Sequence, residues 1–263
     1  MKLRKALEKA SQERGLPSYT DRQEPVGQTA PAHRQEWTPP VYSHSMEYRI
    51  DPEAVLENRG VCISPDSPEM EYYKILRTRI QQQAKTRKIR TLMITSPNRN
   101  EGKTITCINL GLIFAKEFNQ TALLVDCDFK GQDIHRYLGI DSEHSLIDYF
   151  LHDIPLDQLI IWPGIDKLTL ISGDKTVLDS SELLSSEMMT DLVTEMGSRY
   201  EDRYVFFDAP PVLERSEAIS LAPVMDGIIL VVEAGKTSKQ DIEKAIKLLP
   251  KERFLGVVLN KKV

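Results

Sequence analysis

The chain has 263 residues, of which 41% are hydrophobic and 28% charged, and its 34 basic and 39 acidic side chains give a net charge of −5. This composition can build a globular core, while the acidic balance argues against a dedicated nucleic-acid-binding protein, so we expect no nucleic-acid partner. No apolar run approaches the roughly 20 residues of a membrane span, and Cys62, Cys107 and Cys127 fit neither a zinc spacing nor a disulfide framework, which indicates a reducing cytosol.

The first 60 residues differ in composition from the rest. They are rich in Pro, Gln, Glu, Arg and Ser, and eight of the fifteen prolines precede residue 69. Residues 2–14 predict a short charged helix, but from residue 17 to residue 40 no apolar pattern continues. Because such a segment buries too little surface to offset its ordering entropy, we predict a flexible region over residues 1–60 and a folded domain over residues 61–263.

From residue 66 onward the pattern becomes regular. Asp66 or Ser67 can cap a helix that runs to about Lys85, with Pro68 and Glu69 suited to its first turn. Further helices are expected at residues 103–118, 181–198, 214–222 and 238–249. Short apolar runs predict buried strands at residues 92–94, 122–125, 168–171, 204–207, 227–232 and 254–259.

Continuous apolar strands that alternate with helices predict an α/β fold, with a mostly parallel sheet and helices on both faces. Such sheets bind their ligands beyond the carboxyl ends of the strands. The residues that directly follow the predicted strands are therefore the candidates for function.

The first predicted strand is followed by a loop that ends in Gly102, Lys103 and Thr104, as a phosphate-binding loop does. Such a loop points backbone N–H groups and the positive end of a helix dipole at an anion. Lys103 would reach the β and γ phosphates, and the Thr104 hydroxyl would bind Mg²⁺. The candidates for nucleotide binding are Asn100, Glu101, Gly102, Lys103, Thr104 and Ile105. Asn100 replaces a common glycine, and Asn tolerates left-handed backbone. The alternative is an ordinary strand–turn–helix.

Acidic residues follow two further strands. Asp126 and Asp128 come after the second strand, where carboxylates two residues apart can face one side and hold Mg²⁺ or accept a proton. Asp208 follows four apolar residues, as a Mg²⁺ ligand of the Walker B type does. Each acid has an ordinary alternative as part of a solvated turn or a helix cap. The loop and the acids together mark three strand ends of one sheet, and this coincidence predicts a nucleotide site.

These three motifs resemble those of the bacterial tyrosine kinases (BY-kinases), which belong to the deviant-Walker P-loop ATPases of the ParA/MinD kind. The matching segments are Gly102-Lys103-Thr104, residues 124–128 as the Walker A′ element, and residues 207–211. Residues 71–78 resemble the Glu-x-x-Arg-x-x-Arg helix by which these kinases pack into rings. The resemblance covers about residues 65–263.

The resemblance implies an ATP-dependent protein-tyrosine kinase of the autokinase type, which regulates bacterial exopolysaccharide or capsule synthesis and export. Its implied partners are an integral membrane protein that controls polysaccharide chain length or export, and further copies of itself through Glu71, Lys74 and Arg77. It would lie at the inner face of the plasma membrane, on the cytoplasmic side.

The resemblance also implies roles for individual residues. Lys103 and the loop amides would stabilise charge on the transferring group, while Asp126, assisted by Asp128, would lie near the attacking tyrosine oxygen. The Mg²⁺ ligands would come from Thr104, Asp208 and Asp126. In relatives the Asn that ends the last strand contacts adenine, which makes Asn260 the adenine candidate.

The chain departs from the family at its C-terminal end, because Tyr204 is the last tyrosine and no tyrosine cluster follows. The acceptor tyrosines would then lie on another protein or among Tyr19, Tyr42 and Tyr48. Two alternatives therefore stay open. One is a ParA/MinD-like ATPase switch that acts in the same export system without phosphorylating protein, and the other is a non-catalytic nucleotide sensor.

Overall fold

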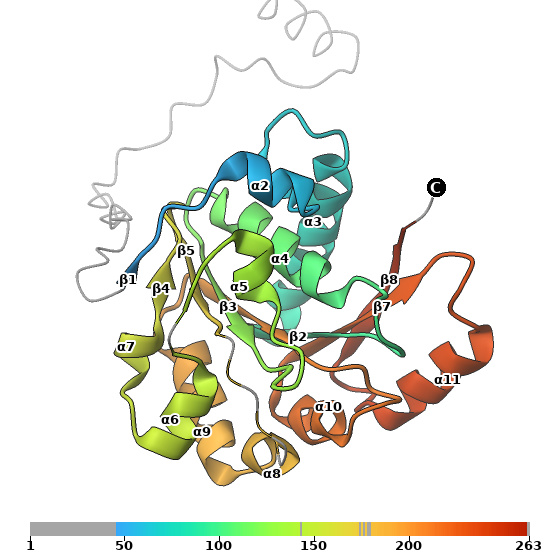
Figure 1. Ribbon diagram of the computed structural model, residues 1–263. Helices are drawn as coiled ribbons and strands as arrows, with labels where there is room; N and C mark the ends of the chain where they lie inside the picture. Colours follow the sequence, from blue (N-terminus) through green and yellow to red (C-terminus); the bar gives the residue numbers. More distant parts are fainter. Residues whose placement is uncertain (1–45, 143, 174, 176, 178–179, 262–263) are drawn as a thin grey trace, which may run out of the picture. The chain divides into compact units, whose positions relative to one another are not determined.

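The computed structural model of the chain describes residues 46–261, apart from residues 143, 174, 176, 178 and 179. The predicted helix at residues 2–14 and the rest of the chain up to residue 45 lie outside the described residues. The described residues form an eight-stranded sheet with helices on both faces (Figure 1). This arrangement confirms the α/β fold that the alternation of apolar strands and helices predicted.

Across the sheet the strands follow the order β1-β4-β5-β3-β6-β2-β7-β8. Neighbouring strands are parallel except for β4 and β5, which are antiparallel. The strand bounds are β1 Met46–Glu47, β2 Thr91–Thr95, β3 Thr121–Asp126, β4 Ile161–Trp162, β5 Leu168–Ile171, β6 Arg203–Asp208, β7 Gly227–Glu233 and β8 Phe254–Asn260. All six predicted strands are present, and only the two-residue strands β1 and β4 were not predicted.

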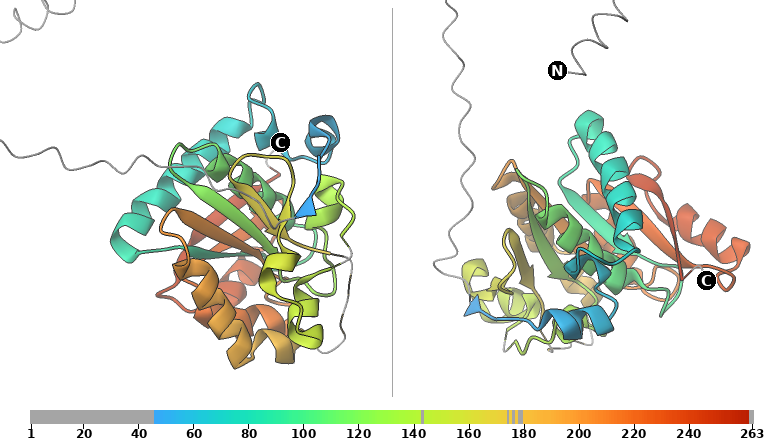
Figure 2. Two further views of the ribbon diagram at one scale, coloured as in Figure 1. Left: turned by 90° about the vertical axis from the view of Figure 1, so that its left-hand side faces the viewer. Right: turned by 90° about the horizontal axis from the view of Figure 1, so that it is seen from above.

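Two groups of helices sandwich the sheet, as the further views in Figure 2 show. The helices on one face are α2 (Pro52–Glu57), α3 (Met70–Arg87), α4 (Lys103–Ala115) and α5 (Ile134–Leu138). The helices on the other face are α6 (Leu146–His152), α7 (Leu156–Leu159), α8 (Ser180–Leu184), α9 (Glu187–Ser198), α10 (Ser216–Leu221) and α11 (Lys239–Leu248). Among the described helices, none combines the length with the apolar character that a bilayer-spanning segment requires.

Side chains that alternate along each central strand pack into two separate cores, one on each face of the sheet. In β3, Ala122 and Leu124 join the core under α3 and α4, whereas Leu123 and Val125 join the core under α9 and α10. Both sets are buried, which explains why the central strands read as continuous apolar runs rather than as an alternating pattern.

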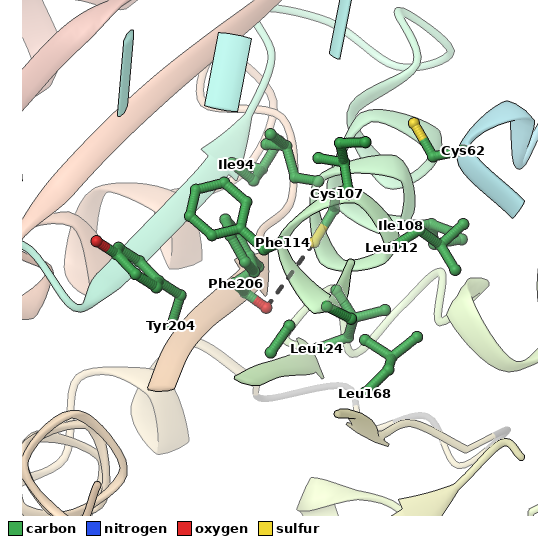
Figure 3. Close-up of a cluster of buried hydrophobic side chains, with 14 of the residues drawn as sticks. Cys62, Ile94, Cys107, Ile108, Leu112, Phe114, Leu124, Leu168, Tyr204 and Phe206 are labelled. Atoms are coloured by element: carbon green, nitrogen blue, oxygen red, sulfur yellow. Dashed lines mark hydrogen bonds between the residues drawn. The ribbon is translucent and has the colours of Figure 1, made fainter. Parts of the chain in front are cut away.

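Phe114 of α4 is a central residue of the first core (Figure 3). Its ring lies 4.7 Å from the ring of Tyr204 and 5.0 Å from the ring of Phe206, measured between centroids. On the preceding turns of the same helix, the Cys107 thiol lies 3.8 Å from the carbonyl oxygen of Phe206. These contacts fix α4 across β6, and α4 is the helix that follows the predicted phosphate-binding loop.

The helix predicted over residues 181–198 is interrupted. It consists of α8 and α9, because Ser186 leaves the helical conformation and its hydroxyl accepts a hydrogen bond from the backbone N–H of Met189 at 3.1 Å. A serine in this position caps a new helix, so α9 begins as a helix separate from α8.

Residues 46–60, which the sequence analysis assigned to the flexible region, contribute to the folded unit. Strand β1 pairs with β4, and Val55 of α2 is 1% exposed. Asn109 of α4 ties this segment down, because its side chain accepts from the N–H of Cys62 at 2.8 Å and donates to the carbonyl of Arg59 at 3.0 Å. A short strand and a six-residue helix carry too weak a periodicity to be predicted from composition.

Strand β8 forms one outer edge of the sheet. Its pairing with β7 shifts register at Gly256, whose φ of 152° lies in the region that favours glycine. Beyond this bulge, Val257 and Leu259 are 45% and 59% exposed. The last residue of the strand is Asn260, and its side chain lies beside Gly102 of the phosphate-binding loop.

The packing of Phe114 predicts a large loss of stability on truncation. Phe114→Ala should lower the free energy of unfolding by about 3–5 kcal/mol, because a fully buried aromatic ring is replaced by a cavity. Tyr72→Ala, at a position that is 74% exposed, is the control and should change it by less than about 0.5 kcal/mol. Urea unfolding of both variants measures the difference, and equal losses would contradict the assignment of Phe114 to the core.

Candidate nucleotide-binding site

The predicted strand-end motifs meet at one place in the sheet. Strands β3, β6 and β2 are consecutive neighbours, Asp126 is the register partner of Asp208, and Asp208 is the register partner of Ile94. The carboxyl ends of these three parallel strands therefore bring Asp126, Asp208 and the loop after β2 together. The strand order was not predicted, but it produces the juxtaposition that the motifs required.

The loop between β2 and α4 has the backbone of an anion-binding turn. Asn100 has a φ of 62° and Gly102 a φ of 93°, so both are left-handed, and the expectation for Asn100 is confirmed. Gly102 stands at the N-cap of α4, where no side chain caps the first turn, and the N–H groups there point beyond the helix. A Cβ atom on Gly102 would lie 2.0 Å from Nδ2 of Asn260, so the close approach of β8 also requires glycine.

Lys103 is the charged centre of the site. Its Nζ lies 2.9 Å from Oδ2 of Asp128 and 3.5 Å from Oδ1 of Asp208. Burial alone would lower the pKa of Lys103, but the carboxylates of Asp208 and Asp128 outweigh it and raise the pKa above its ordinary value. The lysine is therefore a permanent cation between two of the predicted acidic residues.

Thr104 and Asp208 form the second contact of the site. The Thr104 hydroxyl donates to Oδ2 of Asp208 at 2.7 Å, and both side chains are buried. A hydroxyl and a carboxylate are the hard oxygen donors that Mg²⁺ prefers, and Mg²⁺ usually keeps waters and substrate phosphates as its other ligands. These two residues therefore fit a Mg²⁺ site, although within the described part of the chain no three Asp, Glu, His or Cys side chains converge as a metal cluster.

Asp126 accepts hydrogen bonds on both carboxylate oxygens. Its donors are the N–H groups of Asp128, Asp133 and Ile134, at 3.2, 3.1 and 3.1 Å, and the hydroxyl of Ser172, at 3.1 Å. Asp126 thus holds the loop that carries Asp128. Desolvation and the neighbouring Asp208 raise the pKa of Asp126 to about 8.

The remaining predicted residues border the loop. Nδ2 of Asn260 donates to the carbonyl oxygen of Glu101 at 3.0 Å, which places the end of β8 against the loop. Ile105 is partly buried and packs against the core under α4, so its side chain faces the protein. The Glu101 side chain is 2% exposed and also faces inward.

Sequence reasoning missed three side chains that hold the site. Ser172 supports Asp126, the Glu214 carboxylate accepts from the N–H of Arg99 at 2.9 Å, and the Thr237 hydroxyl contacts Glu101 at 2.5 Å. Ser172 directly follows β5, so the rule that located the three motifs would also have found it. Glu214 and Thr237 carry no such signal.

The residues expected to contact further copies of the chain lie on α3. Lys74 and Glu71 pair with each other at 3.1 Å, while Arg77 donates to the carbonyl of Ile113 at 2.8 Å and pairs with Glu117 at 2.5 Å. Arg77 therefore joins α3 to α4 within the chain. Glu71 and Lys74 remain accessible on the helix surface.

A groove of about 410 Å³ lies elsewhere, between α3 and β8. Its lining includes Leu76, Ile80 and Val257 and contains none of the predicted site residues. We place the chemistry at the loop after β2, because that is where the buried charges converge.

The chain is similar in sequence and in fold to known proteins. Residues 91–254 match a sequence family described as an AAA domain. Tyrosine-protein kinase YwqD of Bacillus subtilis (strain 168) is 32% identical over 219 residues, which cover 80% of this chain and 91% of YwqD. The solved kinase domain of Escherichia coli tyrosine kinase ETK matches with a TM-score of 0.71 at 22% identity. The match covers 84% of this chain and 89% of the ETK chain. The septum site-determining protein MinD from Pyrococcus horikoshii OT3, complexed with Mg-ADP, matches with a TM-score of 0.53 at 20% identity. That match covers 65% of this chain and 69% of the MinD chain.

The buried carboxyl groups predict an unusual dependence of stability on pH. Burial raises the pKa of Asp208 to about 6, and Asp126 is raised further, so the folded state binds these protons more tightly than the unfolded state does. Stability from these groups is present below their ordinary pKa and is lost as the pH rises through their folded values. Between pH 5 and pH 8, the free energy of unfolding should therefore fall by about 1–3 kcal/mol more in the wild-type protein than in Asp208→Asn.

Urea unfolding at four pH values across this window measures the effect. Asp191→Asn, at an exposed position of α9, is the matched control and should keep the wild-type profile. An Asp208→Asn profile that runs parallel to the wild-type profile would contradict the assignment.

Proposed function

We propose that this chain, which belongs to the bacterial tyrosine-protein kinases as its motifs predicted, transfers the γ-phosphoryl group of ATP to tyrosine hydroxyls. The observation that carries the proposal is the position of the Lys103 ammonium group at the N-terminus of α4, 2.9 Å from Asp128 and 3.5 Å from Asp208. A buried cation beside backbone N–H groups stabilises the charge that develops on a transferring phosphoryl group.

The nucleotide phosphates would bind at residues 100–105, with Asn260 on the adenine side. Membership of a P-loop family implies nucleotide binding. The left-handed backbone of Asn100 and Gly102 supports this, because such a turn can direct N–H groups toward an anion. Lys103 would leave its carboxylate partners to contact the β and γ phosphates, as a flexible ammonium group can.

Magnesium would be held by Thr104 and Asp208, with Asp126 as the third ligand. Bound Mg²⁺ supplies charge neutralisation on the phosphate oxygens. The role of Thr104 and Asp208 is to fix that charge where the phosphoryl group leaves, and their 2.7 Å hydrogen bond keeps the two oxygens together.

Asp126 and Asp128 would form the acidic side of the site that receives the tyrosine. Desolvation and the neighbouring Asp208 raise the pKa of Asp126, which increases its affinity for a proton. Asp128 is 13% exposed, so an incoming phenol can reach it, whereas Asp126 fixes the loop from beneath. Together they would orient the hydroxyl and take up its proton.

In the cell, the kinase would regulate bacterial exopolysaccharide or capsule synthesis and export from the inner face of the plasma membrane. The proposed partner is an integral membrane protein that controls polysaccharide chain length or export. Self-association would use the exposed Glu71 and Lys74, while Arg77 would support it by holding α3 against α4. The folded domain of this kinase is proposed to extend over residues 61–263, with residues 46–60 packed against it.

Incubation of the purified protein with Mg²⁺ and γ-labelled ATP tests the proposal. Label should appear on tyrosine, and Lys103→Met should reduce it by about 100-fold or more, because the cation that stabilises the transferring charge is lost. Lys239→Met, at a side chain that is 91% exposed, is the matched control and should label normally.

Phosphoamino-acid analysis and free phosphate are measured in the same samples, with and without the cytoplasmic segment of the membrane partner. Free phosphate that depends on Lys103, without label on protein, would overturn autophosphorylation and favour the ATPase switch. Neither product in any sample would favour the non-catalytic nucleotide sensor.

A further inference from the structure

The Glu101 carboxylate is buried within the predicted phosphate-binding loop. Its side chain is 2% exposed, and Oε2 accepts from the N–H of Asn98 at 3.0 Å while Oε1 accepts from the side-chain amide of Asn98 at 3.3 Å. Both contacts lie within the loop itself. Burial of a carboxylate is costly unless its oxygens accept hydrogen bonds.

The missing donor comes from the turn after β7. The Thr237 hydroxyl donates to Oε1 of Glu101 at 2.5 Å and accepts from the N–H of Glu233 at 2.9 Å. Because the N–H of Glu233 can only donate and the Glu101 carboxylate can only accept, the hydroxyl proton of Thr237 is directed at Glu101. The turn is closed by the N–H of Thr237, which donates to the carbonyl of Glu233 at 3.1 Å.

A second contact with the loop comes from Lys261, which directly follows β8 and pairs with the last residue of β7. Nζ of Lys261 donates to the carbonyl oxygen of Asn100 and pairs with Glu233 at 3.1 Å. Lys261, paired with Glu233, and Thr237 therefore reach the loop at two points, the left-handed Asn100 and Glu101. A non-glycine residue in the left-handed region persists only where its surroundings hold it.

We infer that Thr237, acting through the Glu101 carboxylate, holds the phosphate-binding loop in the conformation that receives ATP. Thr237 is thus a positioning residue, and the inference rests on the proposed nucleotide site. Without the hydroxyl, the loop adopts its binding conformation for a smaller fraction of the time. The apparent Kd for ATP is the intrinsic Kd divided by that fraction, so it rises. Phosphoryl transfer from bound ATP is unaffected, since Lys103, Asp128 and Asp208 keep their contacts.

Calorimetric titration of the full chain with Mg·ATP tests this inference. Thr237→Val, which replaces the hydroxyl by a methyl group, should raise the Kd for ATP by about 10-fold. The rate at which label is transferred to tyrosine at saturating ATP should change by less than about 2-fold, which separates loss of binding from loss of catalysis. Thr237→Ser restores the hydroxyl and should bind as the wild-type protein does.

The controls distinguish the inference from the proposed function. Thr190→Val makes the same change on the exposed face of α9 and should leave the Kd unaltered, and Thr237→Ala replaces Thr237→Val if thermal unfolding shows that the valine variant is not folded. An unchanged Kd in the hydroxyl-free variant, an equal loss in Thr237→Ser, or a loss of turnover at unchanged Kd would each overturn the inference while the kinase assignment stands. No ATP binding by the wild-type protein would overturn the proposed function and this inference with it.

Discussion

One buried ammonium group allows the acidic ends of two strands and the loop after a third strand to share one site. Asp126 and Asp208 are 1% and 0% exposed on neighbouring strands, and like charges so placed oppose folding unless a cation or a proton offsets them. Lys103 supplies the cation from the first residue of α4. The position of α4 is in turn fixed by the packing of Phe114 across β6, so the core beneath the helix determines where the charge lies.

Asp126 and the phosphate-binding loop are held in different ways. Asp126 is fixed by four donors from segments that follow β3 and β5, whereas the loop depends on side chains that reach it from the turn after β7 and from the end of β8. The strand order places these two supports on opposite sides of β6 and β2. The acidic half of the site and the anion-binding half can therefore be altered separately.

The fold class, six strands and the three strand-end motifs were predictable, because each leaves a signal within a short stretch of sequence. A continuous apolar run marks a buried parallel strand, and an acid or glycine at its end marks the ligand-binding edge. The contact between Thr237 and Glu101 spans 136 residues and leaves no such signal. The intramolecular pairing of Arg77 was likewise hidden, since a helix pattern does not say whether a basic side chain meets α4 or another molecule.

The open edge at β8 has a consequence for handling the protein. A seven-residue strand with Val257 and Leu259 exposed offers free backbone groups and apolar side chains together, which is the combination that recruits a strand from another chain. The bulge at Gly256 bends the first half of the strand, and Lys261 places a charge at its end. Such features act as gatekeepers against aggregation. Solubility at high concentration is therefore expected to depend on this strand and to fall when the charge at its end is removed.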